Sequence, residues 1–169
     1  MLFSMRVAQF EKIFRALEEA KVDYVVVGGM AVIAHGVVRF TNDLDLVMAF
    51  DEANLLRGMR ALESLGFKPR VPVPAEDFAK VENRRRWASE KNMMVFQMAL
   101  LSEDNLPVDI FIEPPFDVGK ELARAPRYEL APGLMVPVLH LDRLIEMKQK
   151  AGRPRDLDDV ASLKRVQQR

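Results

Sequence analysis

The spacing of apolar residues predicts helices at both ends of the chain. Near the N-terminus, apolar residues recur at i, i+3, i+4 and i+7, with charged residues between them: Phe10, Ile13, Phe14 and Leu17. This spacing is typical of an amphipathic helix, here over about 4–20. Two more helices are expected over about 140–150 and 154–167. Gly152 separates these two, and Pro154 occupies a first-turn position of the second.

Runs of β-branched and apolar residues predict strands in the middle of the chain. The strand-like runs are 24–27, 44–48, 93–100 and 108–112, with shorter ones within 128–138. The third and fourth runs flank a polar turn at 102–107 and predict a hairpin. Helices are expected over 30–35, 51–65 and 76–91, and the prolines of 68–75 predict an extended loop.

Strands and helices alternate imperfectly along this pattern. The alternation favours an α/β (α+β) fold, in which a mixed β-sheet is flanked by helices, over a doubly wound parallel sheet. The length of 169 residues fits a single domain over 1–169, with 140–169 as a C-terminal helical segment.

Composition narrows the range of functions. Lys+Arg and Asp+Glu both number 25, which disfavours a globally basic nucleic-acid binder. The chain has no cysteine, which excludes thiol catalysis, iron–sulfur clusters and cysteine zinc sites. Charges interrupt residues 1–20, so this segment is expected to be neither a signal peptide nor a membrane span. We therefore expect a cytoplasmic protein that does not enter a membrane.

Two aspartates in the second strand-like run are the first sign of chemistry. Side chains alternate along a strand, so Asp43 and Asp45 point to one face, with Cα atoms about 6–7 Å apart. Such a pair suits Mg²⁺ (or Mn²⁺), which takes one or two carboxylates together with substrate phosphates. The alternative is a strand that ends in two solvated aspartates. Aspartate is depleted in strands, however, so two in one strand call for an explanation.

Two further features extend this pattern. Asp109 is a lone carboxylate in the apolar strand 108–112, and it joins Asp43 and Asp45 around a two-metal site if the two strands are neighbours. Otherwise it reaches solvent or an arginine. Gly28 and Gly29 follow a strand and open a helix, a place where backbone N–H groups suit phosphate oxygens. Diglycines also serve as simple tight turns.

The order and spacing of these motifs resemble the DNA polymerase β-like nucleotidyltransferase superfamily. The shared pattern is a strand, Gly28-Gly29, then Asp43-Leu44-Asp45-Leu46, with a third carboxylate on a later strand, here Asp109. The segment 24–48 and the late motif 148–159 resemble more particularly the abortive-infection toxin branch and its small relatives. The resemblance implies the nucleotidyltransferase fold.

The resemblance also implies roles for residues. Asp43, Asp45 and Asp109 are the catalytic and metal-binding candidates. The nucleotide-binding candidates are Gly28, Gly29, Arg39, Thr41, Lys148, Arg153, Arg155 and Asp156. The implied reaction transfers a nucleoside monophosphate from a nucleoside triphosphate such as ATP to an acceptor, with release of pyrophosphate. The acceptor is left open among tRNA, a protein or a small hydroxylated compound.

Several of these candidates have ordinary structural alternatives. Arg39 meets a phosphate or pairs with a nearby aspartate, and Thr41 hydrogen-bonds locally. Lys148 contacts nucleotide or pairs within its helix with Asp142 or Glu146. Asp156 equally suits the N-terminus of the following helix.

The remaining polar residues favour structural roles. His35 and His140 are expected to pack or cap rather than bind metal, because neither has a partner histidine at ligand spacing. Residues 84–87, three arginines and a tryptophan, are a solvated helix face with the tryptophan in the core, or else an RNA-binding surface.

The leading hypothesis is therefore a metal-dependent nucleotidyltransferase. The alternatives are a non-catalytic, nucleotidyltransferase-like partner in a toxin–antitoxin pair or a nucleotide sensor, either of which binds a partner without releasing pyrophosphate. A third is an RNA-binding module, whose salt-sensitive RNA affinity survives loss of Asp43.

Overall fold

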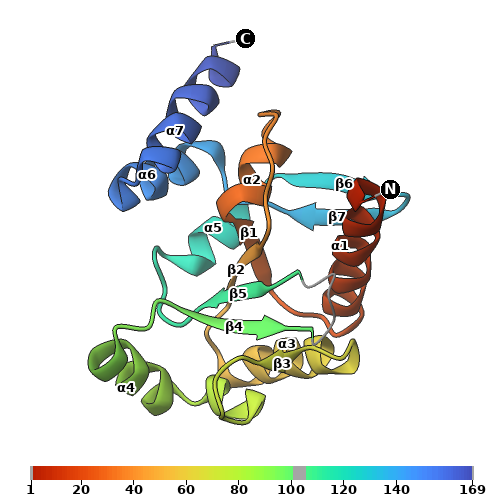
Figure 1. The fold of residues 1–169 in the computed structure, drawn as a ribbon, viewed down its shortest axis with the longest axis vertical. Coiled ribbons are helices and arrows are strands. Elements are labelled where there is room, and N and C mark those ends of the chain that lie inside the picture. Colours follow the sequence, from red (N-terminus) through yellow and green to blue (C-terminus); the bar gives the residue numbers. More distant parts are fainter. Residues whose placement is uncertain (1, 101–105, 169) are drawn as a thin grey trace.

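A five-stranded sheet forms the centre of the molecule (Figure 1). The computed structural model describes residues 2–100 and 106–168. The strands are β1 (Tyr24–Val27), β2 (Leu44–Met48), β3 (Lys68–Pro69), β4 (Val95–Ala99) and β5 (Val108–Phe111). They lie in the order β1-β2-β5-β4-β3, and only β2 and β5 pair in parallel. The prediction of a mixed sheet flanked by helices is confirmed.

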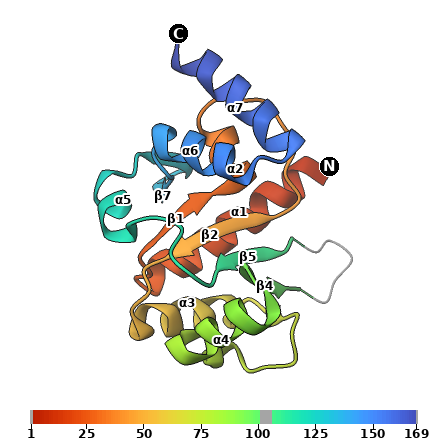
Figure 2. The ribbon, with the colours of Figure 1, turned by 90° about the vertical axis from the view of Figure 1, so that its left-hand side faces the viewer.

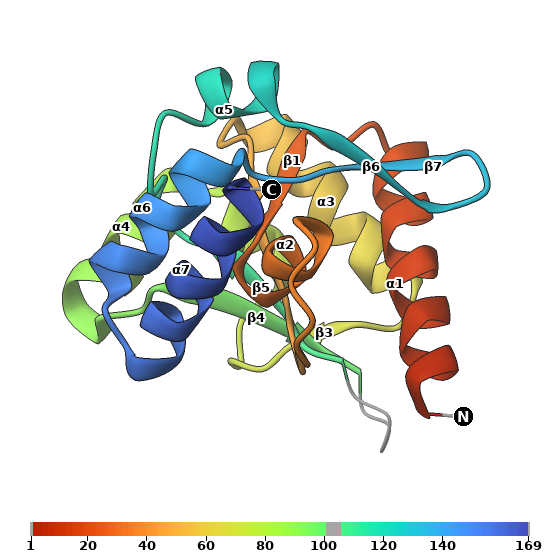
Figure 3. The same cartoon turned by 90° about the horizontal axis from the view of Figure 1, so that it is seen from above.

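Helices flank this sheet toward both ends of the molecule. They are α1 (Leu2–Glu19), α2 (Gly28–Ala34), α3 (Glu52–Ser64), a 3-10 helix η1 (Ala75–Ala79), α4 (Val81–Lys91), α5 (Val118–Arg124), α6 (Leu141–Ala151) and α7 (Pro154–Gln167). Helices α2, α6 and α7 lie toward one end and α3 and α4 toward the other, with the sheet between (Figure 2). Seen from above, α1 lies on the far side of α2 from α6 and α7 (Figure 3). A two-stranded ribbon, β6 (Arg127–Ala131) with β7 (Leu134–Pro137), completes the fold.

The packing of α3 against β2 decides which way the aspartates of that strand face. A side chain at Gly58 of α3 has no room, because a Cβ there would lie 2.6 Å from the sulfur of Met48. Met48 therefore faces α3, and Leu44 and Leu46, which are buried, lie on the same face of the strand because they are four and two residues before it. Asp45 faces the opposite side of the sheet, toward α2.

The sequence pattern misplaced some elements. The helix expected over 76–91 is divided into η1 and α4, because Lys80 between them has an extended backbone. The loop expected over 68–75 contains β3, which pairs with β4 as an edge strand. Helix α5 was not predicted. The strands around the turn expected at 102–107 do form a hairpin, but most of that turn lies outside the described residues.

Within residues 2–100 and 106–168, no helix is both long enough and apolar enough to cross a membrane.

Candidate active site

Three aspartates meet where β2 and β5 lie side by side. The parallel register of these strands places Asp45 directly opposite Asp109, and Asp43 immediately precedes β2. One carboxylate oxygen from each of the three lies within 4.8 Å of the others. The sequence predicted this cluster on the condition that the two strands are neighbours, and the structure fulfils that condition.

Burial, together with the neighbouring negative charges, raises the pKa of Asp45 to about 7. Burial is the largest cause, followed by the carboxylates of Asp43 and Asp109. The charge of Lys148 and a hydrogen bond from the backbone N–H of Gly29 act in the opposite direction. Burial also raises the pKa of Asp109. Carboxylates at such spacing are hard oxygen ligands that a divalent cation neutralises, so the three residues fit an Mg²⁺ or Mn²⁺ site.

The diglycine lies against this cluster. Gly28 has φ +61, a left-handed conformation that disfavours a side chain, and a Cβ there would overlap the Asp45 carboxylate. A Cβ on Gly29 would lie 2.5 Å from Thr41 Oγ1. The two glycines thus let the start of α2 approach the acidic cluster closely, and the N–H of Gly29 donates to Asp45.

The loop that precedes β2 holds Asp43 in place. Thr41 Oγ1 donates to Asp43 Oδ1 at 2.9 Å, which confirms the predicted local hydrogen bond. Arg39, by contrast, pairs with neither Asp43 nor Asp45. Its guanidinium forms an ion pair with Asp159 of α7, so the loop is tied to the C-terminal helices.

Lys148 is the centre of a buried charge cluster between α6 and α7. Its Nζ lies 2.9 Å from Asp156 Oδ1 and 2.8 Å from Asp159 Oδ2. The predicted alternative, pairing with Asp142 or Glu146 within α6, is wrong: Asp142 bonds Arg124 and His140, and Glu146 bonds Arg143. The charge of Lys148 acts on Asp45 and lowers its pKa, so the cluster adjoins the acidic site.

The other nucleotide-binding candidates near the C-terminus, Arg153 and Arg155, lie at the surface. Arg155 is exposed and donates to the backbone oxygen of Phe40 at 2.7 Å. Arg153 is exposed at the N-cap position of α7. The structure therefore brings Asp156 into the buried charge cluster and leaves both arginines at the surface.

The basic cluster at 84–87 is divided between the core and the surface, with Arg84 and Trp87 buried and Arg85 and Arg86 exposed. Arg84 is buried and donates to the backbone oxygens of Phe78 and Ala79 at 2.7 and 2.6 Å. Trp87 is 3% exposed and stacks on Phe96 with ring centroids 5.5 Å apart. Because Trp87 is in the core and Arg84 is engaged with η1, the helix presents no tryptophan on which a nucleic-acid base can stack.

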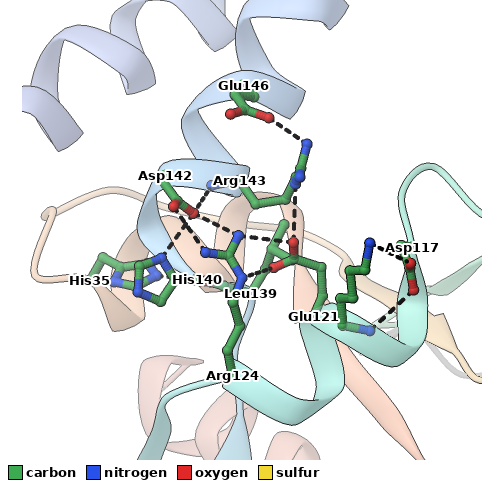
Figure 4. Close-up of polar contacts among 10 residues, drawn as sticks. His35, Asp117, Glu121, Arg124, Leu139, His140, Asp142, Arg143 and Glu146 are labelled. Carbon is green, nitrogen blue, oxygen red and sulfur yellow. Dashed lines mark hydrogen bonds and ion pairs between the residues drawn. The ribbon is translucent and has the colours of Figure 1, made fainter.

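Both histidines make contacts that join different parts of the fold. His35 is buried, where one ring nitrogen contacts the Leu139 carbonyl at 2.8 Å and the other contacts the Tyr128 hydroxyl at 3.1 Å. His140 bonds Asp142 at 2.8 Å and begins a network that joins α5 to α6 (Figure 4). At the centre of this network the buried Glu121 accepts from Arg124 and Arg143. These hydrogen bonds and ion pairs hold α5 against α6.

Sequence reasoning missed Gln97 of β4. Its Nε2 donates to Asp109 Oδ1 at 2.6 Å, so it belongs to the site. The available signal was a polar residue inside the apolar run 95–99, the same signal that pointed to Asp109. Asp159, recognised only as part of the late motif, also proves central, because it pairs with both Arg39 and Lys148.

Comparisons with known proteins agree with this geometry. A family model described as nucleotidyl transferase AbiEii toxin, type IV TA system, matches residues 12–168. No curated protein matches the sequence. Among solved structures, the antibiotic-resistance factor ANT(2'')-Ia is similar at TM-score 0.60 and 18% identity, over 96% of this chain and 83% of that one.

Two other solved structures are similar over nearly their whole length. The lincosamide antibiotic adenylyltransferase LnuA has TM-score 0.60 and 17% identity, over 94% of this chain and 96% of its own. Protein TM1012 of Thermotoga maritima, provisionally assigned as a nucleotidyltransferase, has TM-score 0.58 and 19% identity, over 100% and 97%. At these identities the likeness shows a shared fold.

Proposed function

The chain belongs to the AbiEii nucleotidyl transferase toxin family, and on that premise we propose that it is a metal-dependent enzyme that transfers a nucleoside monophosphate to an acceptor. The family match confirms the resemblance predicted from the glycine and aspartate motifs. The observation that carries the proposal is the acidic cluster, in which oxygens of Asp43, Asp45 and Asp109 lie within 4.8 Å of one another.

In the proposed reaction an acceptor oxygen attacks the α-phosphorus of a nucleoside triphosphate. The new bond joins the acceptor oxygen to the α-phosphorus, the bond from the α-phosphorus to the oxygen that bridges it to the β-phosphorus breaks, and pyrophosphate leaves. When bound, the divalent cation neutralises charge on the phosphates and orients them for attack. The protein itself needs no nucleophile, because this chemistry relies on positioning and charge neutralisation.

The residues of the site divide these tasks. Asp43 and Asp45 hold the metal, and Asp109 completes the set and receives the proton of the acceptor. The position of Asp109 supports this last role, because it lies opposite Asp45 with an oxygen within 4.8 Å of the other two carboxylates, where an ionised carboxylate can accept a proton. Gly28 and Gly29 allow the triphosphate to approach Asp45, since side chains there would fill the space.

The nucleotide is further held by the positive charges beside the cluster. The charge of Lys148 acts on Asp45, and Asp156 and Asp159 hold its ammonium group. In the proposal this ammonium group also contacts the triphosphate. Arg39 and Thr41 act through the loop that fixes Asp43, and Arg153 and Arg155 lie at the outer edge. We also place the protein in the cytoplasm, where nucleoside triphosphates are available.

A second candidate function follows from the description of the family. A toxin of a toxin–antitoxin system is counteracted by an antitoxin, so a partner protein is part of the proposal. A chain that served only as a non-catalytic partner or nucleotide sensor would bind without releasing pyrophosphate. The complete acidic cluster supports catalysis, because a pure binder has no need of three converging carboxylates.

The test is incorporation of nucleotide labelled at the α-phosphate. Each of the four nucleoside triphosphates is incubated with Mg²⁺ and a cell extract, which is then separated into RNA, protein and small molecules. Wild type should label one fraction, and Asp43→Asn and Asp45→Asn should not. Asp158→Asn, at an exposed position of α7, is the control and should retain activity. Near-wild-type labelling by the two site variants would contradict the proposal.

A further inference from the structure

A lateral row of residues crosses the sheet beside the acidic cluster. Asp45 of β2 lies opposite Asp109 of β5, and Asp109 lies opposite Gln97 of β4. The row ends at Arg70, immediately after the edge strand β3, where the backbone N–H of Arg70 donates to the backbone oxygen of Gln97. Residues directly opposite each other on paired strands project to the same face. The sheet register therefore places the Gln97 side chain next to Asp109, just as it places Asp109 next to Asp45.

The contact between Gln97 and Asp109 has a defined chemistry. The Nε2 of Gln97 lies 2.6 Å from Asp109 Oδ1. An ionised carboxylate only accepts hydrogen bonds, so it is the amide nitrogen of Gln97 that must face it. A hydrogen bond to one oxygen fixes the rotation of the carboxylate, and Asp109 still offers an oxygen within 4.8 Å of Asp43 and Asp45.

The donor in this contact is neutral. A lysine or arginine at this position would orient Asp109 but would also cancel the negative charge that attracts a cation. An amide orients the carboxylate and leaves that charge in place. The positive charge in the row, on Arg70, acts on Asp109 from one strand farther away, and its side chain is exposed.

From this arrangement we propose that Gln97 is a positioning residue, which holds the Asp109 carboxylate in the orientation that metal binding requires. The proposal rests on the proposed function, since it assumes that Asp109 is a metal ligand. It assigns a specific task to a residue that acts on the metal site through Asp109. Partners that orient a ligating carboxylate in this way typically contribute 10- to 100-fold to metal affinity or activity.

The experiment is a titration with Mn²⁺ alone, followed by calorimetry, without nucleotide. The proteins are wild type, Gln97→Met, Asp109→Asn and the double variant. We expect Gln97→Met to weaken Mn²⁺ binding about 10-fold in the wild-type background. In the Asp109→Asn background the same change should alter binding less than about 2-fold, because Gln97 acts through Asp109.

A second variant and a control separate this effect from damage to the sheet. The second variant, Gln97→Asn, keeps the amide but shortens its reach by one methylene, so it should weaken Mn²⁺ binding as Gln97→Met does. Gln167→Met makes the same side-chain change at an exposed position of α7 and should leave binding unchanged. Circular dichroism checks that each variant is folded, and the two Gln97 variants provide independent tests.

The outcomes distinguish the two proposals. If wild type binds no Mn²⁺ at millimolar concentration, there is no preformed metal site for Gln97 to orient and the role of Gln97 is overturned; the metal-dependent function itself fails only if labelled nucleotide is not incorporated either. If wild type binds Mn²⁺ and both Gln97 variants bind it equally well, the function stands and the role of Gln97 is overturned. An equal loss in the wild-type and Asp109→Asn backgrounds also overturns it, since Gln97 would then not act through Asp109.

Discussion

Replacing Asp45 with asparagine should make the metal-free protein more stable while destroying its metal site. Burial and the carboxylates of Asp43 and Asp109 raise the pKa of Asp45 from 3.8 to about 7. Each pKa unit corresponds to about 1.4 kcal/mol, so keeping Asp45 ionised in the folded state costs at most about 4 kcal/mol. Asparagine carries no charge, and its side-chain oxygen can still accept the N–H of Gly29.

The sign of the pH dependence follows from the direction of this shift. Between pH 4 and 7 the folded state keeps a proton on Asp45 that the unfolded state has released. The wild-type free energy of unfolding therefore loses this contribution as the pH rises through that window. The stability gap between Asp45→Asn and wild type should be near zero at pH 4 and grow toward its limit of about 4 kcal/mol at pH 8.

The assay is urea unfolding followed by circular dichroism at several pH values, with chelator present. Asp158→Asn, an exposed aspartate of α7, is the matched control and should show no pH-dependent gap from wild type. When Mg²⁺ replaces the chelator, it should stabilise wild type and leave Asp45→Asn unchanged, because only wild type offers the complete set of carboxylates. An Asp45→Asn variant that is less stable than wild type at pH 8, or a gap independent of pH, would refute the reasoning.

Two other substitutions test the surroundings of the site. Gly28→Ala should lower the unfolding free energy by at least about 1–2 kcal/mol, because the left-handed backbone at this position disfavours a side chain. It should also abolish nucleotide transfer, because the added methyl group overlaps Asp45. Thermal unfolding and label incorporation measure the two effects, and a stable, active variant would contradict the geometry. Lys148→Met should cost about 3–5 kcal/mol in urea unfolding, because Asp156 loses the cation it pairs with and Asp159 keeps only Arg39. The exposed Lys150→Met should cost little, and equal losses would argue against the buried cluster.

The parts of the fold that apolar periodicity encodes were predictable from the sequence. The N-terminal helix buries Phe10, Ile13, Phe14 and Leu17, the residues whose spacing identified it. Helix α5 escaped notice because it has only 7 residues and its one buried residue is Glu121, which forms ion pairs with Arg124 and Arg143. Val118 and Leu122 of α5 also pack against the core, but a single i, i+4 pair is too short a pattern to identify a helix.

The acidic residues of the site were predictable for a related reason. Aspartates are unusual in strands, so Asp43, Asp45 and Asp109 were conspicuous in the sequence. The partners of the site were harder to find. The ion pair of Arg39 with Asp159 joins residues 120 positions apart, and no local pattern specifies such a contact. The basic cluster at 84–87 looked continuous in the sequence, but burial of Arg84 and Trp87 divides it.

The measurement that tests the central claim most directly compares nucleoside triphosphate labelled at the α-phosphate with the same compound labelled at the γ-phosphate. Nucleotidyl transfer predicts that the α label joins the acceptor and that the γ label leaves as pyrophosphate, both requiring Asp43 and Asp45. Transfer of the γ label to the acceptor, or its release as inorganic phosphate, would contradict the account, because either product places the bond cleavage at the γ-phosphate.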